Sequence, residues 1–289
     1  MDCQAFDTPA GGFGWEGATH LRVQPTTGVG RLDLRAVWDF RELLFFLTWR
    51  DISIRYKQTL LGAAWTILQP VLTMVLFTIV FGQFAKMPSD GLPYSIFAFA
   101  ALVPWTYFSQ AISRSSVSLV NDPNLIKKVY FPRLLIPLSG AAAPLVDFLV
   151  CLVVLLLMMG WYGIPLHWNL LAVPVLLVVT LSAALAVGVW LAPLNARYRD
   201  IAYAIPFLTQ FWFYASPIAY PLSLVPEKWR VLYGLNPMVG LIEGFRWALL
   251  GSAAPDQRIL VVSGLVVVLL LASGLMFFTW MERALADVI

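Results

Sequence analysis

Six long apolar stretches dominate the chain. A helix needs about 20 mostly apolar residues to cross the hydrocarbon layer of a membrane. The stretches that meet this requirement are Trp65–Phe84, Pro93–Ile112, Leu134–Met159, Leu170–Leu191, Ile201–Tyr220 and Ile259–Trp280. The last contains no charged residue, whereas Pro206 and Pro217 interrupt the fifth. The pattern predicts an all-α integral membrane protein with six transmembrane helices.

The segment before the first span has a different pattern. Apolar residues recur there at helical spacing, at Val37, Phe40, Leu44 and Leu47. Charged residues fall on another face, which is typical of an amphipathic helix lying in the membrane interface. The alternative is a cytosolic amphipathic helix packed on a partner. Phe45, Phe46 and Trp49 widen the apolar face and favour the interface.

The connection between the second and third spans contains a delimited short helix. Asp122 can cap its free amides, Pro123 suits its first position, and Pro132 prevents its continuation. The helix would be apolar at Leu125, Ile126 and Val129 and cationic at Lys127 and Lys128. Such a helix is suited to dock in a groove of another protein. A solvated turn whose lysines only enforce topology fits the pattern equally well.

The region after the fifth span, from Ser216 to Gly251, is semi-apolar but carries several charges. We expect short re-entrant helices on the outer side, broken at Pro217, Pro221, Pro226 and Pro237. Irregular backbone can lie at membrane depth only where protein or a water-filled cavity satisfies its polar groups. An external amphipathic cap is the alternative, and the periodicity does not separate the two.

Composition and charge agree with a membrane protein and indicate its orientation. Hydrophobic residues make up 60% of the chain and charged residues 12%, against about a quarter charged in soluble domains. The net charge of +3 gives no indication of a nucleic-acid partner. With six spans, 14 of the 19 lysines and arginines fall on one side and 5 on the other. This asymmetry predicts that both termini lie in the cytoplasm.

The motifs of enzymes and nucleotide-binding proteins are missing from the sequence. There is no G-x-x-x-x-G-K-[ST] loop, H-E-x-x-H or G-x-S-x-G motif. We therefore expect no enzyme, no metal and no cofactor bound by this chain, and any ATP would be hydrolysed by a partner. Asp147 is the lone acidic residue in the apolar spans. We expect it to bond to a neighbouring helix, because a proton relay would need a second acidic group.

Several ordered sequence blocks point to a known family. They are Arg50–Ile52 with Arg55–Lys57 and Leu61–Trp65, Pro104–Phe108, Asn124–Lys128 with Phe131–Arg133, Asn195–Asp200, Ser216–Ile218, and Asn236–Pro237 followed by Arg246–Trp247. In this order the chain, from about Leu34 to its end, resembles the ABC-2-type transmembrane subunits that export polysaccharides, such as O-antigen and lipid-linked teichoic acid permeases.

The resemblance implies an assembly and a cargo. It implies a homodimer in the bacterial inner membrane, docked on two copies of an ABC ATPase that carries ATP and Mg. The cargo would be an undecaprenyl-linked glycan, O-antigen first, with capsular polysaccharide, teichoic acid, or a lipid or drug as alternatives. A membrane glycosyltransferase is a third class, but Asp51 and Asp200 are the only acidic residues near apt positions and both lie beside arginines.

The resemblance also implies roles for individual segments. Residues 32–64 would be cytoplasmic interface and gate helices, and 65–289 the six-span domain. Residues 1–31 are predicted to be a flexible tail from their composition, which is rich in Gly, Thr and Pro and lacks periodicity. Val37–Trp49 would be the interface helix and Ser216–Leu250 the periplasmic gate helices. The lipid head group and gate would involve Arg50, Arg55, Tyr56 and Lys57. Coupling to the ATPase would involve Asn124, Leu125, Ile126, Lys127, Lys128 and Val129.

Aromatic residues in the second and fifth spans are candidates for a pore lining. Sugar rings can stack their apolar faces on aromatic side chains. Residues three apart share a helix face, which selects Trp105 with Phe108 and Phe211 with Tyr214. The alternative is that these rings only pack between helices.

Overall fold

The computed structural model describes residues 34–57, 62–122, 125 and 131–288, and within these ranges every regular element is a helix. The predicted flexible tail over residues 1–31 lies outside the described part. Five helices are long and apolar enough to cross a membrane, namely Ala64–Phe84, Tyr94–Asn121, Leu135–Trp161, Trp168–Arg197 and Gln257–Glu282. The chain is therefore a multi-pass membrane protein.

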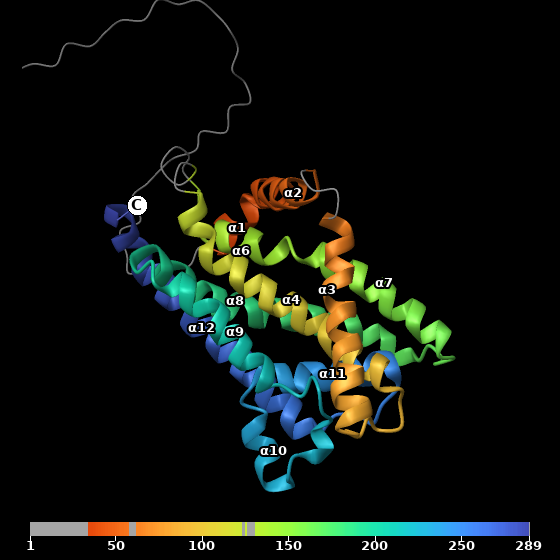
Figure 1. Cartoon of the computed structure of the whole chain (residues 1–289). Helices are drawn as coiled ribbons and strands as arrows, with labels where there is room; N and C mark the ends of the chain where they lie inside the picture. The colour runs from red at the N-terminus through yellow and green to blue at the C-terminus, as the bar shows by residue number, and fades with distance from the viewer. Residues whose placement is uncertain (1–33, 58–61, 123–124, 126–130, 289) are drawn as a thin grey trace, which may run out of the picture.

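These spans combine several helical elements (Figure 1). The first consists of α3 (Gly62–Phe77) and the π-helical segment Thr78–Phe84, and the second is α4 (Tyr94–Asn121). The third contains α6 (Leu135–Ala142) and α7 (Leu145–Trp161). The fourth contains a short 3-10 helix (Trp168–Ala172) and α8 (Val173–Arg197), and the last lies in α12 (Gln257–Val288).

The predicted fifth span is the element that the structure corrects. Its helix, α9 (Ile201–Tyr214), has 14 residues and ends before Pro217. At 1.5 Å per residue it is about 21 Å long, shorter than the hydrocarbon layer of about 30 Å. A continuous span to Tyr220 is therefore wrong, because proline disfavours helical backbone at the residue before it. Figure 1 shows α9 running from the end of α8 toward α10.

Two helices precede the first span. They are α1 (Leu34–Asp39) and α2 (Arg41–Lys57), and α2 lies across one end of the long helices, the α2 end, in Figure 1. Val37, Phe40 and Leu44 pack against a cluster that includes Leu119 and Ile136. The predicted amphipathic helix thus buries one face on its own chain. Phe45, Phe46 and Trp49 are exposed, and their position in a membrane interface stays a prediction.

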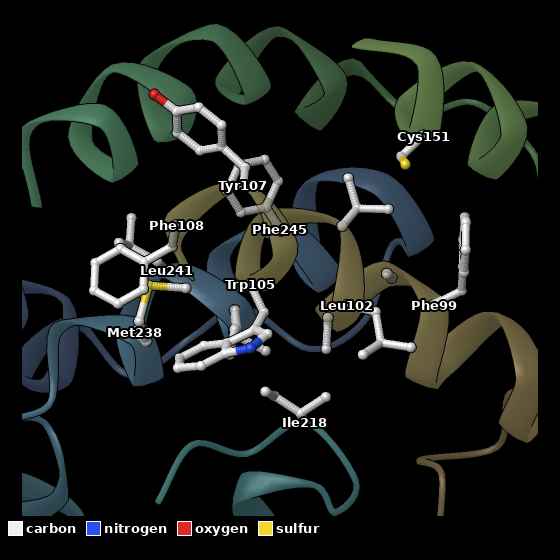
Figure 2. Packing of buried hydrophobic residues seen from close by; sticks show 14 of the residues in the cluster. Phe99, Leu102, Trp105, Tyr107, Phe108, Cys151, Ile218, Met238, Leu241 and Phe245 are labelled. Atoms are coloured by element: carbon white, nitrogen blue, oxygen red, sulfur yellow. The ribbon is translucent and has the colours of Figure 1, made fainter. Parts of the chain in front are cut away.

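The centre of the protein is built around α4. This helix is buried on most of its surface and packs against α3, α6, α7, α8 and α11. Figure 2 shows its aromatic side chains gathered with Met238, Leu241 and Phe245 of α11. At Gly188 of α8, an added Cβ would lie 2.4 Å from the hydroxyl oxygen of Ser115. A glycine is therefore required for α4 and α8 to approach this closely.

The segment after α9 forms short elements at the opposite end of the molecule, the α10 end (Figure 1). They are a 3-10 turn (Leu222–Leu224), α10 (Glu227–Tyr233) and α11 (Pro237–Leu250). The predicted breaks at the prolines are confirmed, and the Asn236 side chain caps α11 by accepting from the Met238 amide at 3.0 Å. Because α11 is largely buried, an external cap describes it poorly. Re-entry into the membrane stays a prediction.

One buried arginine joins two of the sequence blocks in this region. Arg246 is 2% exposed and pairs with Glu243 at 2.9 Å. It also donates a hydrogen bond of 3.0 Å to the carbonyl of Ile218, and its guanidinium lies 3.6 Å from the centre of the Phe97 ring. The Ser216–Ile218 turn is thereby fixed to α11 and α4.

Candidate functional site

A groove lies between α3, α4 and α9, and we call it the central groove. Its volume is about 360 Å³. The residues that line it are Gln69, Pro70, Thr73 and Phe77 of α3, Leu102, Trp105, Thr106, Ser109 and Gln110 of α4, and Thr209, Gln210, Phe213 and Tyr214 of α9. The α3 and α4 residues belong to the middle of two predicted membrane crossings, which places the groove at membrane depth.

The lining of the central groove is unusually polar for this depth. It includes three glutamines, Gln69, Gln110 and Gln210, four serine or threonine side chains, and the hydroxyl of Tyr214. A polar group facing lipid without a hydrogen-bond partner costs free energy. The groove therefore suits a polar cargo, whether or not a second protein surface also covers it.

The four aromatic residues selected from the sequence lie in three different environments. Trp105 and Tyr214 line the central groove. Phe108 is fully buried, and its ring lies 5.1 Å from that of Trp212 in an edge-to-face contact. Figure 2 shows the rings of Trp105 and Phe108 projecting from α4 into the apolar core. Phe211 is 65% exposed and does not line the groove.

Phe213 is an aromatic lining residue that helical spacing did not select. It lines the groove, and its ring lies 5.5 Å from that of Trp105. Gln69 and Gln210 were likewise not selected from the sequence. The available signal was a glutamine inside an apolar span, where an amide needs a polar neighbour.

A polar cluster at the α2 end joins α2 to three long helices. Arg55 forms an ion pair with Asp147 of α7, and Tyr56 donates a hydrogen bond to the same carboxylate. Thr66 of α3 donates to Asp147 at 3.3 Å. Arg55 also donates to the amide oxygen of Gln110 at 3.2 Å. The predicted bonding of Asp147 to a neighbouring helix is confirmed, and Gln110 connects this cluster to the central groove.

The Tyr56 hydroxyl stays protonated over the physiological pH range. Burial raises the pKa of Tyr56 above its ordinary value of 10.0, and the hydrogen bond to Asp147 raises it further. The neutral phenol is the form that can donate to a carboxylate. Tyr56 is thus a hydrogen-bond donor that helps hold α2 on α7.

Arg50 links α2 to the end of α4. Its guanidinium donates to the two oxygens of Asp122 at 3.1 and 2.6 Å, and to Asp51 at 2.9 Å. Burial lowers the pKa of Arg50, but the hydrogen bonds and charges of Asp122 and Asp51 outweigh it, and the pKa is raised overall. Asp122 was expected to cap a short helix, and the structure shows its carboxylate held by Arg50. Lys57 is exposed.

A second groove, of about 330 Å³, lies beside these residues. Arg50, Asp51, Arg114 and Asp122 line it, together with Ile54 of α2 and uncharged residues of α4 and α6. Sequence reasoning assigned Arg114 to a loop, but the residue belongs to α4. Within the part of the chain that the structure describes, its guanidinium has no hydrogen-bond or ion-pair partner. A lone arginine among serines, from Ser113 to Ser116, was the signal for it.

Only one of the six predicted coupling residues is described. Leu125 packs against the cluster that also receives Val37 and Phe40. Asn124, Ile126, Lys127, Lys128 and Val129 lie outside the described residues. Leu125 therefore has a contact within its own chain, and docking of this segment on a partner stays a prediction.

Comparison with known proteins agrees with this arrangement. Residues 42–250 match the family model described as ABC-2 type transporter. The O-antigen export system permease protein RfbA of Myxococcus xanthus is 29% identical over 247 residues, covering 84% of this chain and 94% of the relative. A Klebsiella pneumoniae protein of the same name is 25% identical over 252 residues, covering 86% and 95%.

A third relative is named for a different cargo. The polysialic acid transport protein KpsM of Escherichia coli is 23% identical over 248 residues, covering 82% of this chain and 92% of the relative. The family model covers most of the chain, including α2, the central groove and α11. The chain therefore belongs to the ABC-2 type transporter family.

Proposed function

We propose that this chain is the transmembrane subunit of an ATP-driven exporter. Its cargo is an undecaprenyl-linked polysaccharide, O-antigen first, which it moves across the bacterial inner membrane. The observation that carries the proposal is the central groove, where amide, hydroxyl and aromatic groups share one wall at membrane depth. Similarity to O-antigen export permeases over most of both chains supports it.

The chemistry of this lining suits a sliding polysaccharide. Amides such as Gln69 and Gln210 can exchange hydrogen bonds with sugar hydroxyls. The exposed ring of Tyr214 offers a face on which the apolar sides of sugars can stack, whereas Trp105 lines the groove but is largely buried. Neither contact demands one fixed order of sugars, so a chain of repeating units can move past them.

The proposed assembly is a homodimer of six-crossing subunits on two ABC ATPase subunits. In this assembly a second copy of the chain would enclose the central groove. The sixth crossing would consist of α9 and the segment that follows it, because Figure 1 shows α9 running toward the α10 end. The distribution of lysine and arginine supports cytoplasmic termini, with the α2 end on the cytoplasmic side. ATP and Mg belong to the ATPase partner.

The head group of the lipid carrier is proposed to bind near the α2 end. Arg50 and Arg55 are already held by carboxylates, which suits positioning of α2. Lys57 is exposed, and Arg114 has no hydrogen-bond or ion-pair partner among the described residues, so both have charge available for a diphosphate. Charge-assisted hydrogen bonds to phosphate are strong, and arginine makes them through two donors.

Other cargoes fit this geometry less well. A lipid or drug exporter would be expected to have an apolar pocket, whereas the central groove has seven amide or hydroxyl side chains besides Tyr214. For a glycosyltransferase, Asp51 is held by Arg50 and Asp200 is exposed outside both grooves. Capsular polysaccharide or teichoic acid remains the alternative within the same mechanism.

The test is export in a defined bacterial strain. A strain that makes lipid-linked O-antigen but lacks its own permease and ATPase receives this chain with its cognate ATPase. We expect glycan at the cell surface when both proteins are present and none when the ATPase cannot hydrolyse ATP. Absence of surface glycan, with both proteins inserted and associated, would contradict the proposal.

A further inference from the structure

The central groove carries no charged side chain among the lining residues that the structure describes. Apart from the indole N–H of Trp105, its polar side-chain groups are amides and hydroxyls, from Gln69 on α3 through Thr106 on α4 to Gln210 on α9. In a chain with 35 charged residues (19 basic and 16 acidic), this neutrality covers three helices at once. The general rule that charges avoid membranes accounts for this neutrality, and it has a consequence for any charged cargo that enters the groove.

Charged residues gather instead beyond the two ends of this groove. At the α2 end, the lining residue Gln110 accepts a hydrogen bond from Arg55, whose charge is paired with that of Asp147. At the α10 end, Asp90 accepts a hydrogen bond from Ser223 at 3.4 Å and lies outside the lining. The groove is thus a neutral stretch between two charged regions.

We propose that the central groove selects uncharged glycans and disfavours polyanionic ones. The inference rests on the proposed export function and names the chemical class of its cargo. A neutral sugar exchanges its hydrogen bonds with water for hydrogen bonds with amides and hydroxyls. A carboxylate in each repeat would lose much of its hydration at this depth without finding a cation to pair with.

A second copy of the chain would not alter this balance. A symmetric partner presents the same lining, so the enclosed passage would be neutral on both walls. Residues 58–61, which connect α2 to α3 and lie outside the described part, are Gln, Thr, Leu and Leu and also carry no charge. The cations near the α2 end are then available for the single diphosphate of the carrier lipid and not for every sugar that follows.

The experiment compares two cargoes in the complete transporter. Permease and cognate ATPase are reconstituted in proteoliposomes with two lipid-linked glycans of equal length on the same carrier. One has a neutral hexose repeat and the other has one carboxylate in each repeat. We expect the acidic glycan to be exported at least about tenfold more slowly, which corresponds to about 1.4 kcal/mol.

A charge placed in the groove should change this preference. Gln210→Lys adds a cation to the lining, and we expect it to raise export of the acidic glycan relative to the neutral one severalfold. Gln83→Lys makes the same substitution at an exposed position outside the lining and serves as the control. It should leave the ratio at the wild-type value.

The outcomes separate the inference from the function on which it rests. Equal or faster export of the acidic glycan by the unaltered protein would overturn neutral selectivity while leaving glycan export intact. The same change of ratio in the Gln83 and Gln210 variants would also overturn it, since the groove would then not be the selective element. Export of neither glycan would contradict glycan export itself, and the inference with it.

Discussion

Arg55, at the end of α2, forms an ion pair with Asp147 of α7, 92 residues later in the chain. The carboxylate is almost fully buried, and it also accepts from Tyr56 and Thr66. The pair fixes the C-terminal end of α2 on the long helices beside the central groove. A movement of α2 would therefore have to break this cluster or carry α7 with it.

Asp147→Asn should destabilise the protein. The substitution keeps an acceptor for Tyr56 but removes the charge that compensates Arg55, and breaking a buried pair typically costs about 3 kcal/mol. We expect a lower melting temperature in detergent and less folded protein. Cys151→Ala, one turn further along α7, removes a buried side chain without removing a charge and serves as the control. Equal melting temperatures of Asp147→Asn and the wild type would contradict the structural role of the pair.

The Tyr56 hydrogen bond predicts a pH dependence of stability. The pKa of Tyr56 is raised in the folded protein, so the neutral phenol is favoured by folding. This contribution is complete below the ordinary value of 10.0 and is lost as the pH rises through the higher folded pKa. The melting temperature of the wild type should exceed that of Tyr56→Phe from pH 7 to 9. The two should converge above pH 10, and a constant difference up to pH 11 would argue against the assignment.

The bond between Arg50 and Asp122 predicts a defect in coupling. Asp122 directly precedes the segment predicted to dock on the ATPase, and Arg50 joins Asp122 to α2. Arg50→Lys keeps the charge but loses the two-point contact. We expect ATP hydrolysis to continue while glycan export per ATP falls severalfold. Arg41→Lys, on the exposed start of α2, is the control. If both variants export normally, the bond has no part in coupling.

The apolar pattern was sufficient to predict most of the membrane crossings but not their ends. The second span was expected to stop at Ile112, yet α4 continues to Asn121. Its last turns contain serines and Arg114, whose helical backbone is stabilised by packing against α8 and α6 and not by lipid. Hydropathy does not detect such contacts. Hydropathy also does not detect the break in the third span near Pro144, because a local turn leaves the average hydropathy unchanged.

The sites were harder to predict because they depend on contacts between distant segments. The cations of α2 were found from the sequence, but their partners Asp122 and Asp147 follow only from the fold. Helical spacing correctly grouped Trp105 with Phe108 on one side of α4. It did not show that both rings are buried in the core and that only Trp105 also lines the groove, because periodicity gives the face of a helix and not what packs against it.

The aromatic residues should therefore behave differently when truncated. Phe108→Ala removes a fully buried ring and should lower stability by roughly 3–5 kcal/mol, with loss of folded protein. Tyr214→Ala removes an exposed groove residue and should leave the fold intact while export falls. Phe211→Ala, exposed on the same helix but outside the lining, is the control. Parallel loss of fold and export at Tyr214 would show that its ring serves packing alone.

The central claim is that the polysaccharide passes through the central groove, and photo-crosslinking tests it most directly. A photoreactive amino acid is placed at Gln210, in the groove, or at Leu149, exposed on α7 outside the groove. The transporter is illuminated during export with ATP and without it. We predict glycan adducts at position 210 that require ATP, and none at position 149. Adducts at position 149 alone, or equal labelling at both positions, would contradict passage through this groove.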